Sequence, residues 1–361
     1  MSEKVTQTDI ANHLNISRLT VSKALNNVNG VSEDTRKLIL HTAKELGYRK
    51  LSKNQLLTLQ NRGSTNQDRK NQSLKQIALF LKLGLATDSY WAPVIRGMVT
   101  VLSERGYSLN LCFLTISNGD AFEFPMNFNL KETCGIIQFG DFERKHIEQL
   151  RSTGLPMVSI DTMIQKEDVE LFSDTIMNIN IDPMAGLVEH LVSHGYKRIG
   201  YAGERGAQLT MHERWLGYCK GMKKAGLKIE EENCFFGSYD EIIAKMEKEN
   251  RLADMKKFPD AIMCCNDMQA ISLMQFFQQN GIRMPEMVAI TGHDNVEQAM
   301  IADLTTINVD KEELGKCAAE TMLWRINSPN RPHRMIRLYD AQLIVRGTTN
   351  GIHQKGGASD E

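Results

Sequence analysis

Three polar side chains directly follow apolar segments that have the length and composition of buried strands. Asp161 follows the segment PMVSI, Asn266 follows AIMCC, and Asp294 follows MVAITGH. Ligands of parallel sheets bind at the carboxyl ends of the strands, in the crevice beside the sheet. Carboxylate and amide groups at this edge accept hydrogen bonds from the hydroxyl groups of a ligand. Their positions predict a binding site for a small polar molecule; the alternative for any one carboxylate is a charge in a loop.

The chain lacks the residue patterns of an enzyme. The acidic and amide side chains have no paired nucleophile and base, and the sequence contains no GxSxG, Walker loop or HExxH. Its seven cysteines are an odd number without CxxC spacing, and most lie in apolar runs. We therefore expect neither a zinc site nor a disulfide framework, no cofactor, and a binding protein rather than an enzyme.

A second set of candidate functional residues lies in the segment 6–26, TQTDIANHLNISRLTVSKALN. This segment has the pattern of a helix-turn-helix. Ala11 is small enough for two helices to cross closely, and Asn15 tolerates the positive φ that the turn requires. Ser17 is suited to cap the second helix. The inward positions are apolar at helical spacing, namely Ile10, Leu14, Ile16, Val21 and Ala24. The alternative is an ordinary helical hairpin within a larger core.

The second of these helices exposes side chains that suit a DNA major groove. Arg18 can donate two hydrogen bonds to guanine, and Leu19 can contact a thymine methyl group. Thr20 and Ser22 are expected to hold phosphates and set the register on the duplex. Lys23 reaches a guanine edge, but without the fixed fork of an arginine. The alternative for Arg18 is a solvated surface arginine.

The distribution of charge supports a nucleic-acid partner at one end of the chain. Residues 1–75 contain 13 Lys and Arg against 6 Asp and Glu, a surplus of +7. The other 286 residues contain 30 against 38, a deficit of −8, so the net charge is only −1. A basic head on an acidic body is typical of a protein that meets phosphate at one end only.

The elements that must position these residues divide into a helical head and an α/β body. Ser32 caps a third helix that Gly47 ends, and a polar, basic linker follows. From Gln76 onward, apolar strand candidates alternate with amphipathic helices, which implies parallel sheets with helices on both faces. Eight or more strands over about 270 residues suggest two subdomains. The strand candidates are 77–81, 108–114, 135–139, 156–160, 177–181, 198–202, 261–265 and 287–291, and the clearest helices are 92–105, 185–194 and 268–279.

Several separated blocks of the body, together with the helix-turn-helix, resemble the LacI/GalR (lactose/galactose repressor) family in the order of that family. The blocks are IDPMAGLVEHLVSHGYKRIGYAG, HERWLGY, CNDMQAISLMQFFQQNGIRMPEMVAITGHDN, LTTINVDKEELGKCA and LIVRGT. The resemblance implies a DNA-binding headpiece, a linker with a hinge helix, and a core like periplasmic sugar-binding proteins. The core closes over a small ligand, and the chain crosses between its subdomains near 177–181, 303–309 and 336–341. The resemblance also implies a homodimer on a pseudo-palindromic double-stranded DNA operator.

For DNA binding, the resemblance points to one set of headpiece residues and one wedge residue. The predicted contacts are Thr6, Ser17, Arg18, Leu19, Thr20, Ser22, Lys23, Asn26 and Leu57. Leu57 falls at the position of the minor-groove leucine that kinks DNA and couples headpiece to core. The linker nevertheless departs from the family pattern, since Lys50-Leu51 follows Arg49, Asn54 occupies an alanine position, and the linker is about nine residues longer. The alternative for Leu57 is an ordinary residue in a loose tether.

For effector binding, the resemblance adds Arg214, within HERWLGY, at the position of a ligand-binding arginine. Together with Asp161, Asn266 and Asp294, a guanidinium can satisfy vicinal hydroxyl groups, which suits a sugar. Tyr90, Trp91 and Tyr239 offer flat faces for a pyranose ring. His293 stands where relatives often have Phe or Tyr, so the specificity of the pocket cannot be transferred from them.

The sequence thus predicts a transcriptional regulator, with the function of a repressor, whose operator affinity is set by a sugar or sugar derivative. The alternative is a sugar-binding protein of the same fold whose atypical hinge weakens DNA binding. The N-terminal segment has no apolar signal core and no apolar run is long enough to span a membrane, so we expect the cytoplasm. The expected domains are a headpiece (1–50), a linker (51–75), an N-subdomain (about 76–178 and 308–338), a C-subdomain (about 179–305 and 339–346) and a disordered tail (347–361).

Overall fold

The computed structural model describes residues 5–26, 28, 30–48, 75–82, 89–115, 122–140, 142–162, 171–206 and 208–350. The chain divides into two compact units, Met1–Ser73 and Leu74–Glu361, which we describe separately as the headpiece and the core. The predicted wedge residue Leu57 and the last eleven residues, 351–361, lie outside the described residues.

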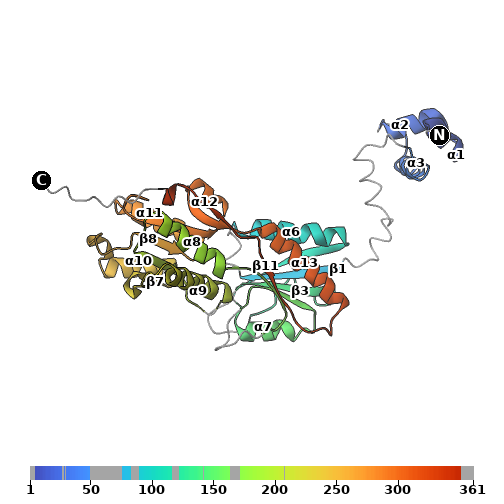
Figure 1. Ribbon diagram of the computed structural model, residues 1–361. Helices are drawn as coiled ribbons and strands as arrows, with labels where there is room; N and C mark the ends of the chain where they lie inside the picture. Colours follow the sequence, from blue (N-terminus) through green and yellow to red (C-terminus); the bar gives the residue numbers. More distant parts are fainter. Residues whose placement is uncertain are drawn as a thin grey trace. The chain divides into compact units, whose positions relative to one another are not determined.

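The headpiece is a three-helix unit with its own small core (Figure 1). Its helices are α1 (Gln7–Leu14), α2 (Arg18–Leu25) and α3 (Glu33–Glu45). Asn15 ends α1 in the left-handed conformation with φ 52°, and the Ser17 side chain caps α2 by accepting a hydrogen bond from the Thr20 amide. Both features match the predicted turn. The side chains that fill the centre are Ile10, Ala11, Val21, Ala24, Ile39 and Ala43.

The first sheet of the core is entirely parallel, in the order β11-β5-β4-β3-β1-β2. Its strands are β1 (Lys75–Lys82), β2 (Tyr107–Leu114), β3 (Thr133–Phe139), β4 (Met157–Ile160), β5 (Asp174–Asn178) and β11 (Met335–Leu338). Helices α6 (Trp91–Glu104) and α13 (Lys311–Asn327) cover one face, and α7 (Arg144–Arg151) covers the other (Figure 1).

The second sheet has the order β12-β10-β9-β8-β6-β7, and only its edge strand β12 is antiparallel. Its strands are β6 (Ile199–Gly203), β7 (Cys234–Phe236), β8 (Ala261–Cys264), β9 (Ala289–Asp294), β10 (Thr305–Asn308) and β12 (Gln342–Ile344). Helices α8 (Ile181–Ser193) and α9 (Leu209–Lys224) pack on one face, and α10 (Tyr239–Lys248) and α11 (Asp267–Gln279) on the other. Short elements η2 (Glu231–Asn233), η3 (Arg251–Ala253), α12 (Glu297–Ile301) and η4 (Gly347–Thr349) complete this half.

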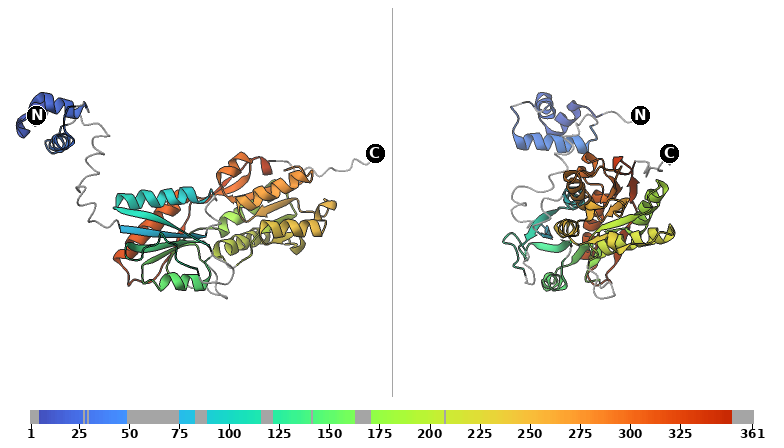
Figure 2. Two further views of the ribbon diagram at one scale, coloured as in Figure 1. Left: turned by 180° about the vertical axis from the view of Figure 1, so that it is seen from behind. Right: turned by 90° about the vertical axis from the view of Figure 1, so that its left-hand side faces the viewer.

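The two sheets lie side by side in the core, each with helices on both faces (Figure 2). The chain passes between them three times, after β5, after β10 and after β11. The predicted α/β class with two parallel-sheet subdomains and a helical headpiece is confirmed. Among the described residues, no helix is both long enough and apolar enough to cross a membrane.

Two local predictions are wrong. The strand expected at 177–181 ends at Asn178, because α8 already begins at Ile181 and takes the last apolar residue of that segment. The tail, expected to be disordered from residue 347, instead begins with a 3-10 turn at Gly347–Thr349. Thr349 is fully buried there because its hydroxyl bonds to His190 and Thr305, which attaches this end of the chain to the second sheet.

Candidate functional site

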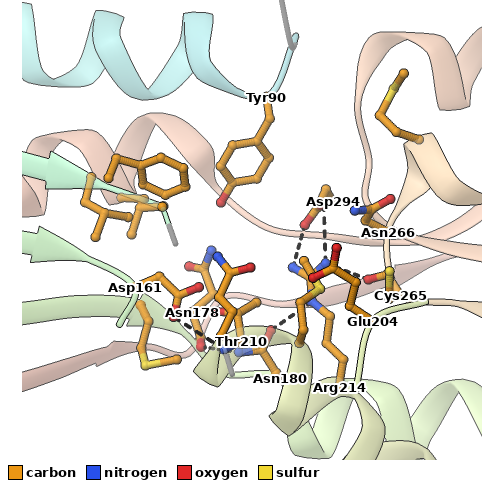
Figure 3. Close-up of a pocket in the computed structure, with 18 of the residues that line it drawn as sticks. Tyr90, Asp161, Asn178, Asn180, Glu204, Thr210, Arg214, Cys265, Asn266 and Asp294 are labelled. Carbon is orange, nitrogen blue, oxygen red and sulfur yellow. Dashed lines mark hydrogen bonds and ion pairs between the residues drawn. The ribbon is translucent and has the colours of Figure 1, made fainter. Parts of the chain in front are cut away.

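The core contains a cavity of about 300 Å³ between the carboxyl ends of the two sheets, a size within the range of small-molecule sites (Figure 3). The first sheet contributes the ends of β3, β4 and β5, and the second sheet contributes the ends of β6, β8 and β9. The polar residues that line the cavity are Asp161, Asn178, Asn180, Glu204, Gln208, Thr210, Arg214, Asn266, Gln269 and Asp294.

Arg214, on α9, forms the centre of a buried polar network on one wall. Its Nη2 donates to Asp294 Oδ1 at 2.8 Å, its Nη1 to the Cys265 carbonyl at 2.6 Å, and its Nε to Asn180 Oδ1 at 3.2 Å. On burial alone the pKa of Asp294 would rise, but Arg214 and His293 outweigh this and hold it at about 2. Asp294 is therefore a permanent anion, and Arg214 is its counter-ion.

His293, the residue before Asp294 in β9, supports this pair. Its Nδ1 lies 2.9 Å from Asp294 Oδ1, and the imidazole is completely buried. Burial and the positive charge of Arg214 lower the pKa of His293 to about 4, so the ring is neutral at pH 7. Since an ionised carboxylate only accepts hydrogen bonds, Nδ1 carries the proton and donates it toward Asp294.

Asp161, at the end of β4, forms the opposite wall and reaches across to the other half of the core. Its Oδ1 accepts hydrogen bonds from the amide of Thr162 at 2.7 Å and from the amide of Thr210, at the start of α9, at 3.3 Å. Burial raises the pKa of Asp161 to about 6, although these hydrogen bonds oppose the rise. The side chain therefore titrates close to neutral pH.

Both acidic residues occupy strained backbone conformations. Asp161 has φ 67° and Asp294 has φ 109°, and Asn295 follows with φ 50°. Positive φ is uncommon in non-glycine residues, and such conformations cluster at functional sites because the surrounding structure must hold them. Here the network around Arg214 stabilises the conformation of Asp294, and the amide donors of Thr162 and Thr210 stabilise that of Asp161.

Aromatic side chains close a further wall of the cavity. Tyr90 and Trp91, at the start of α6, meet edge to face with ring centroids 4.8 Å apart, and Phe139 lies beside Trp91. The Tyr90 hydroxyl points into the cavity, toward the side that Asp161 and Asn178 line (Figure 3). Burial, and then the negative charge of Asp294, raise the pKa of Tyr90, which keeps the phenol protonated.

Six of the seven residues predicted to bind effector line this cavity together: Tyr90, Trp91, Asp161, Arg214, Asn266 and Asp294. Their contact with a ligand stays a prediction. The structure does not bring Tyr239 to the cavity. It is the first residue of α10, because Ser238 and Glu241 form a capping box that starts a helix there.

Sequence reasoning missed six polar residues of the lining: Asn178, Asn180, Glu204, Gln208, Thr210 and Gln269. Asn178 and Asn180 fall within the predicted strand 177–181, which in fact ends at Asn178. Glu204 directly follows β6, so the rule that identified Asp161 would have found it. Thr210 carries no sequence signal, because its amide and side chain meet Asp161 only through the folding of the chain.

In the headpiece, the predicted DNA-contacting residues fall into an exposed group and a capping group. Arg18 and Leu19 are exposed in the first turn of α2. Leu19 is a large apolar side chain, yet 65% of its surface is accessible. Thr20, Ser22 and Lys23 are half-buried, and Asn26 is exposed just after the helix. Arg36 on α3, which was not predicted, donates to the carbonyls of Lys23, Ala24 and Val28 and so holds the end of α2.

Two predicted DNA contacts also have structural roles at helix N-termini. Thr6 forms a capping box with Asp9, in which the Thr6 amide donates to the Asp9 carboxylate at 2.7 Å. Ser17 caps α2, and its hydroxyl lies 2.8 Å from that of Thr20. Within the described ranges, no group of three or more His, Cys, Asp or Glu side chains could hold a metal ion.

Comparison with known proteins agrees with both parts of the structure. The model of bacterial regulatory proteins of the lacI family matches residues 6–50, and that of the periplasmic binding protein-like domain matches residues 188–349. The HTH-type transcriptional repressor PurR of Photobacterium profundum is 26% identical over 351 residues, which cover 96% of this chain and 98% of that repressor. The same-named repressor of Pasteurella multocida is 25% identical over 343 residues, 94% and 96% of the two chains.

Solved structures show the same fold. The transcriptional regulator CelR in complex with cellobiose aligns with a TM-score of 0.64 at 21% identity, over 96% of this chain and all of that chain. The lac repressor dimer bound to operator and the anti-inducer ONPF aligns with a TM-score of 0.57 at 18% identity, over 96% and 99%. A LacI family transcriptional regulator from Enterococcus faecium with bound ribose aligns over 76% of this chain and 98% of that chain, with a TM-score of 0.60 at 20% identity. The chain thus combines a helix-turn-helix of the lacI family of bacterial regulatory proteins with a periplasmic binding protein-like domain, in a sequence that aligns over nearly its whole length with transcriptional repressors.

Proposed function

We propose that this protein is a repressor whose headpieces bind a pseudo-palindromic operator and whose affinity for that operator is set by a carbohydrate in the core cavity. The observation that carries the proposal is the cavity itself. It combines a fixed polar network with an aromatic wall at the carboxyl ends of both sheets, in a chain whose first unit is a helix-turn-helix. A ligand that binds one arrangement of the core better than another shifts the population of DNA-binding molecules.

The headpiece supports the DNA-binding part. Exposed Arg18 and Leu19 project from the first turn of α2, where recognition helices contact base edges. A homodimer would present two such helices to two half-sites, and the lac repressor, a protein of the same fold, was solved as a dimer on its operator. Binding to chromosomal DNA requires that the protein act in the cytoplasm.

The cavity supports a carbohydrate as the ligand. Asp161, Asn266 and Asp294 can accept hydrogen bonds from hydroxyl groups, while Tyr90 and Trp91 offer flat faces to a sugar ring. Two regulators with this fold were solved with the sugars cellobiose and ribose. Asp161, Arg214, Asn266 and Asp294 are the residues that we assign to ligand contact.

DNA binding is tested by fluorescence anisotropy on DNA from upstream of the protein's own gene, at several salt concentrations. We expect binding that weakens steeply with salt, and a loss of about 1–3 kcal/mol in Arg18→Ala because a bidentate base contact is removed. Arg105→Ala, which removes an exposed arginine of the core, is the matched control. Binding that is absent or insensitive to salt would overturn the regulator and leave the alternative, a sugar-binding protein whose linker, with Lys50-Leu51 and Asn54, no longer couples to DNA.

Ligand binding is tested by a thermal-shift screen of sugars, sugar phosphates and purines. A ligand at 100 times its Kd stabilises the folded protein by about 2.7 kcal/mol. The hit should lower or raise operator affinity in the anisotropy assay. Asp294→Asn, which removes the charge but keeps the shape of the side chain, should abolish the shift; an undiminished shift would show that the ligand binds elsewhere.

A further inference from the structure

We propose that the ligand of the core cavity carries a positively charged amino group, as an amino sugar does, and that the carboxylate of Asp161 is its counter-ion. The inference rests on the proposed carbohydrate function and narrows it to one class of ligand. It also predicts that sugar phosphates and other anionic derivatives are rejected.

The charges of the lining do not balance. Two buried carboxylates, those of Asp161 and Asp294, line the cavity, and Arg214 is the single cation among the lining residues that the structure describes. At neutral pH an empty cavity of this composition favours a ligand that brings positive charge, because buried charges are costly unless they are paired.

Arg214 is not available to a ligand anion. Its guanidinium already donates to both oxygens of Asp294, to the Cys265 carbonyl and to Asn180 (Figure 3). A phosphate or carboxylate in the cavity would have to displace Asp294 from this network, and Asp294 would then stand uncompensated beside a second anion. The positive charge of Arg214, which could otherwise attract an anionic ligand, is therefore neutralised by Asp294 of the protein itself.

Asp161 is the carboxylate that lacks a cation. It is only 4% exposed, and its hydrogen-bond donors in the described structure are neutral: the amides of Thr162 and Thr210, both received by Oδ1, and the Thr210 side chain. Two cations act on it from a distance, and each is paired with another acid: Arg214 of α9 with Asp294, and Arg337 of β11 with Glu213 at 2.7 Å. A carboxylate offers about four lone-pair sites, so Asp161 can accept further hydrogen bonds from a ligand.

A second observation shows that the lining is incomplete without a ligand. Three buried polar atoms of lining residues have no hydrogen-bond partner within the described part of the chain: Trp91 Nε1, Asn178 Oδ1 and Gln269 Nε2. These side chains are 6%, 8% and 8% exposed. Buried polar groups are normally satisfied, so two donors and one acceptor around one cavity indicate partners supplied from outside the chain. Ring hydroxyl groups can serve both kinds, because a hydroxyl both donates and accepts.

The experiment compares matched sets of three sugars that differ in charge. For the gluco, galacto and manno series, the neutral sugar, the 2-amino sugar and the 6-phosphate are titrated into the full-length protein by isothermal calorimetry at pH 7. In the series that binds, the amino sugar should bind at least 10-fold more tightly than the neutral sugar, and the phosphate should not bind.

The matched variant is Asp161→Asn, which keeps the Oδ1 acceptor for the two amides and replaces Oδ2 with an amide nitrogen. It should reduce the ratio of the affinities for the amino sugar and the neutral sugar to about one. Equal binding of neutral and amino sugars, binding of a phosphate, or an unchanged preference in Asp161→Asn would each overturn the inference but leave the carbohydrate proposal standing. Failure of all nine compounds to bind would overturn both the inference and the carbohydrate proposal. The operator assay would then decide whether the protein is still a DNA-binding regulator.

The pH dependence gives an independent readout. Because burial raises the pKa of Asp161 to about 6, affinity for the amino sugar should increase as pH rises from about 5 to 7, and more steeply than affinity for the neutral sugar. Tyr90 faces Asp161 from the start of α6, but its raised pKa keeps it neutral over this range, and Arg214 and Arg337 stay charged. A level profile for the amino sugar would contradict the role of Asp161.

Discussion

At the scale of single residues, the core is organised by one buried ion pair that is satisfied on every side. Asp294 and Arg214 are 9% and 4% exposed, and His293, Asn180 and the Cys265 carbonyl complete their hydrogen bonds. A buried pair contributes little net stability, but removal of one partner leaves an uncompensated charge. The pair therefore fixes the geometry of the cavity more than it stabilises the fold.

Asp294→Ala should consequently destabilise the core by about 3–5 kcal/mol, since Arg214 is left buried without its counter-ion. All three tryptophans, Trp91, Trp215 and Trp324, lie in the core, so fluorescence during urea unfolding reports on this unit. Asp182→Ala breaks the exposed ion pair with Lys220 and should change stability by less than about 0.5 kcal/mol. If the two variants lost similar amounts of stability, Arg214 would not need Asp294 as its counter-ion.

Removing the charge of Asp294 should destabilise the core, whereas removing the charge of Asp161 should stabilise it. Its folded pKa of about 6 lies above the ordinary aspartate value of 3.8, so the stabilising protonated form is fully present below about pH 4 and is lost as pH rises through 6. Asp161→Asn should therefore be more stable than the original protein at pH 7, by on the order of 2–3 kcal/mol, with no difference at pH 4. Urea unfolding at both pH values measures this, and a variant that is less stable at pH 7 would contradict it.

At the scale of elements, the first sheet depends on one close helix crossing. Glycines at the crossing let the backbones of α6 and α13 touch: a Cβ on Gly97 would meet the Glu312 carbonyl, and one on Gly315 would meet that of Val94. Neither carbonyl can move without bending its helix. The alternating strand–helix pattern predicted both the sheet and α6, but not this crossing, since α13 comes from a remote part of the chain.

Gly97→Ala should therefore cost about 2 kcal/mol or more of core stability through overpacking. Gly186→Ala is the control, because Gly186 is also inside a helix, α8, but has no atom within 4 Å of an added Cβ. It should gain up to about 1 kcal/mol from helix propensity. Tryptophan fluorescence in urea measures both, and a harmless Gly97→Ala would mean that α6 and α13 can separate at no cost.

How far the sequence predicts each element depends on how local its signal is. Long apolar strands such as β1 and β9, and the capped turn at Asn15 and Ser17, were predicted because their reasons lie within a few residues. The strands β7, β10, β11 and β12 were not among the strand candidates. They have three or four residues each, and their pairing partners, not their own pattern, make them strands.

The same reasoning separates the predicted from the missed parts of the cavity. Asp161, Asn266 and Asp294 were found because each lies at, or within two residues of, the carboxyl end of a well-marked strand. Tyr239 was misplaced although the S-x-x-E capping signal before α10 was readable from the sequence. The pairing of Asp294 with Arg214 could not be predicted, because it joins residues 80 positions apart through tertiary structure.

At the scale of the whole molecule, the uneven charge controls where and how tightly the chain meets DNA. The excess of Lys and Arg in residues 1–75 attracts phosphate, and the acidic core repels it. The logarithm of the operator binding constant should fall linearly with the logarithm of salt concentration, and Lys23→Ala should reduce that slope by about 1 if Lys23 releases one counter-ion. Lys223→Ala, on α9 of the core, should leave the slope unchanged; equal slopes for Lys23→Ala and the original protein would exclude this contact.

The positive φ angles of Asp161 and Asp294 limit how this protein can be re-engineered as a biosensor. Only Gly, Asn and Asp adopt such angles at low cost, so random libraries at these two positions would yield mostly misfolded variants. The aromatic wall of Tyr90, Trp91 and Phe139 has no such restriction. New specificities should therefore be sought by diversifying that wall, with the two acidic positions restricted to Asp, Asn and Gly.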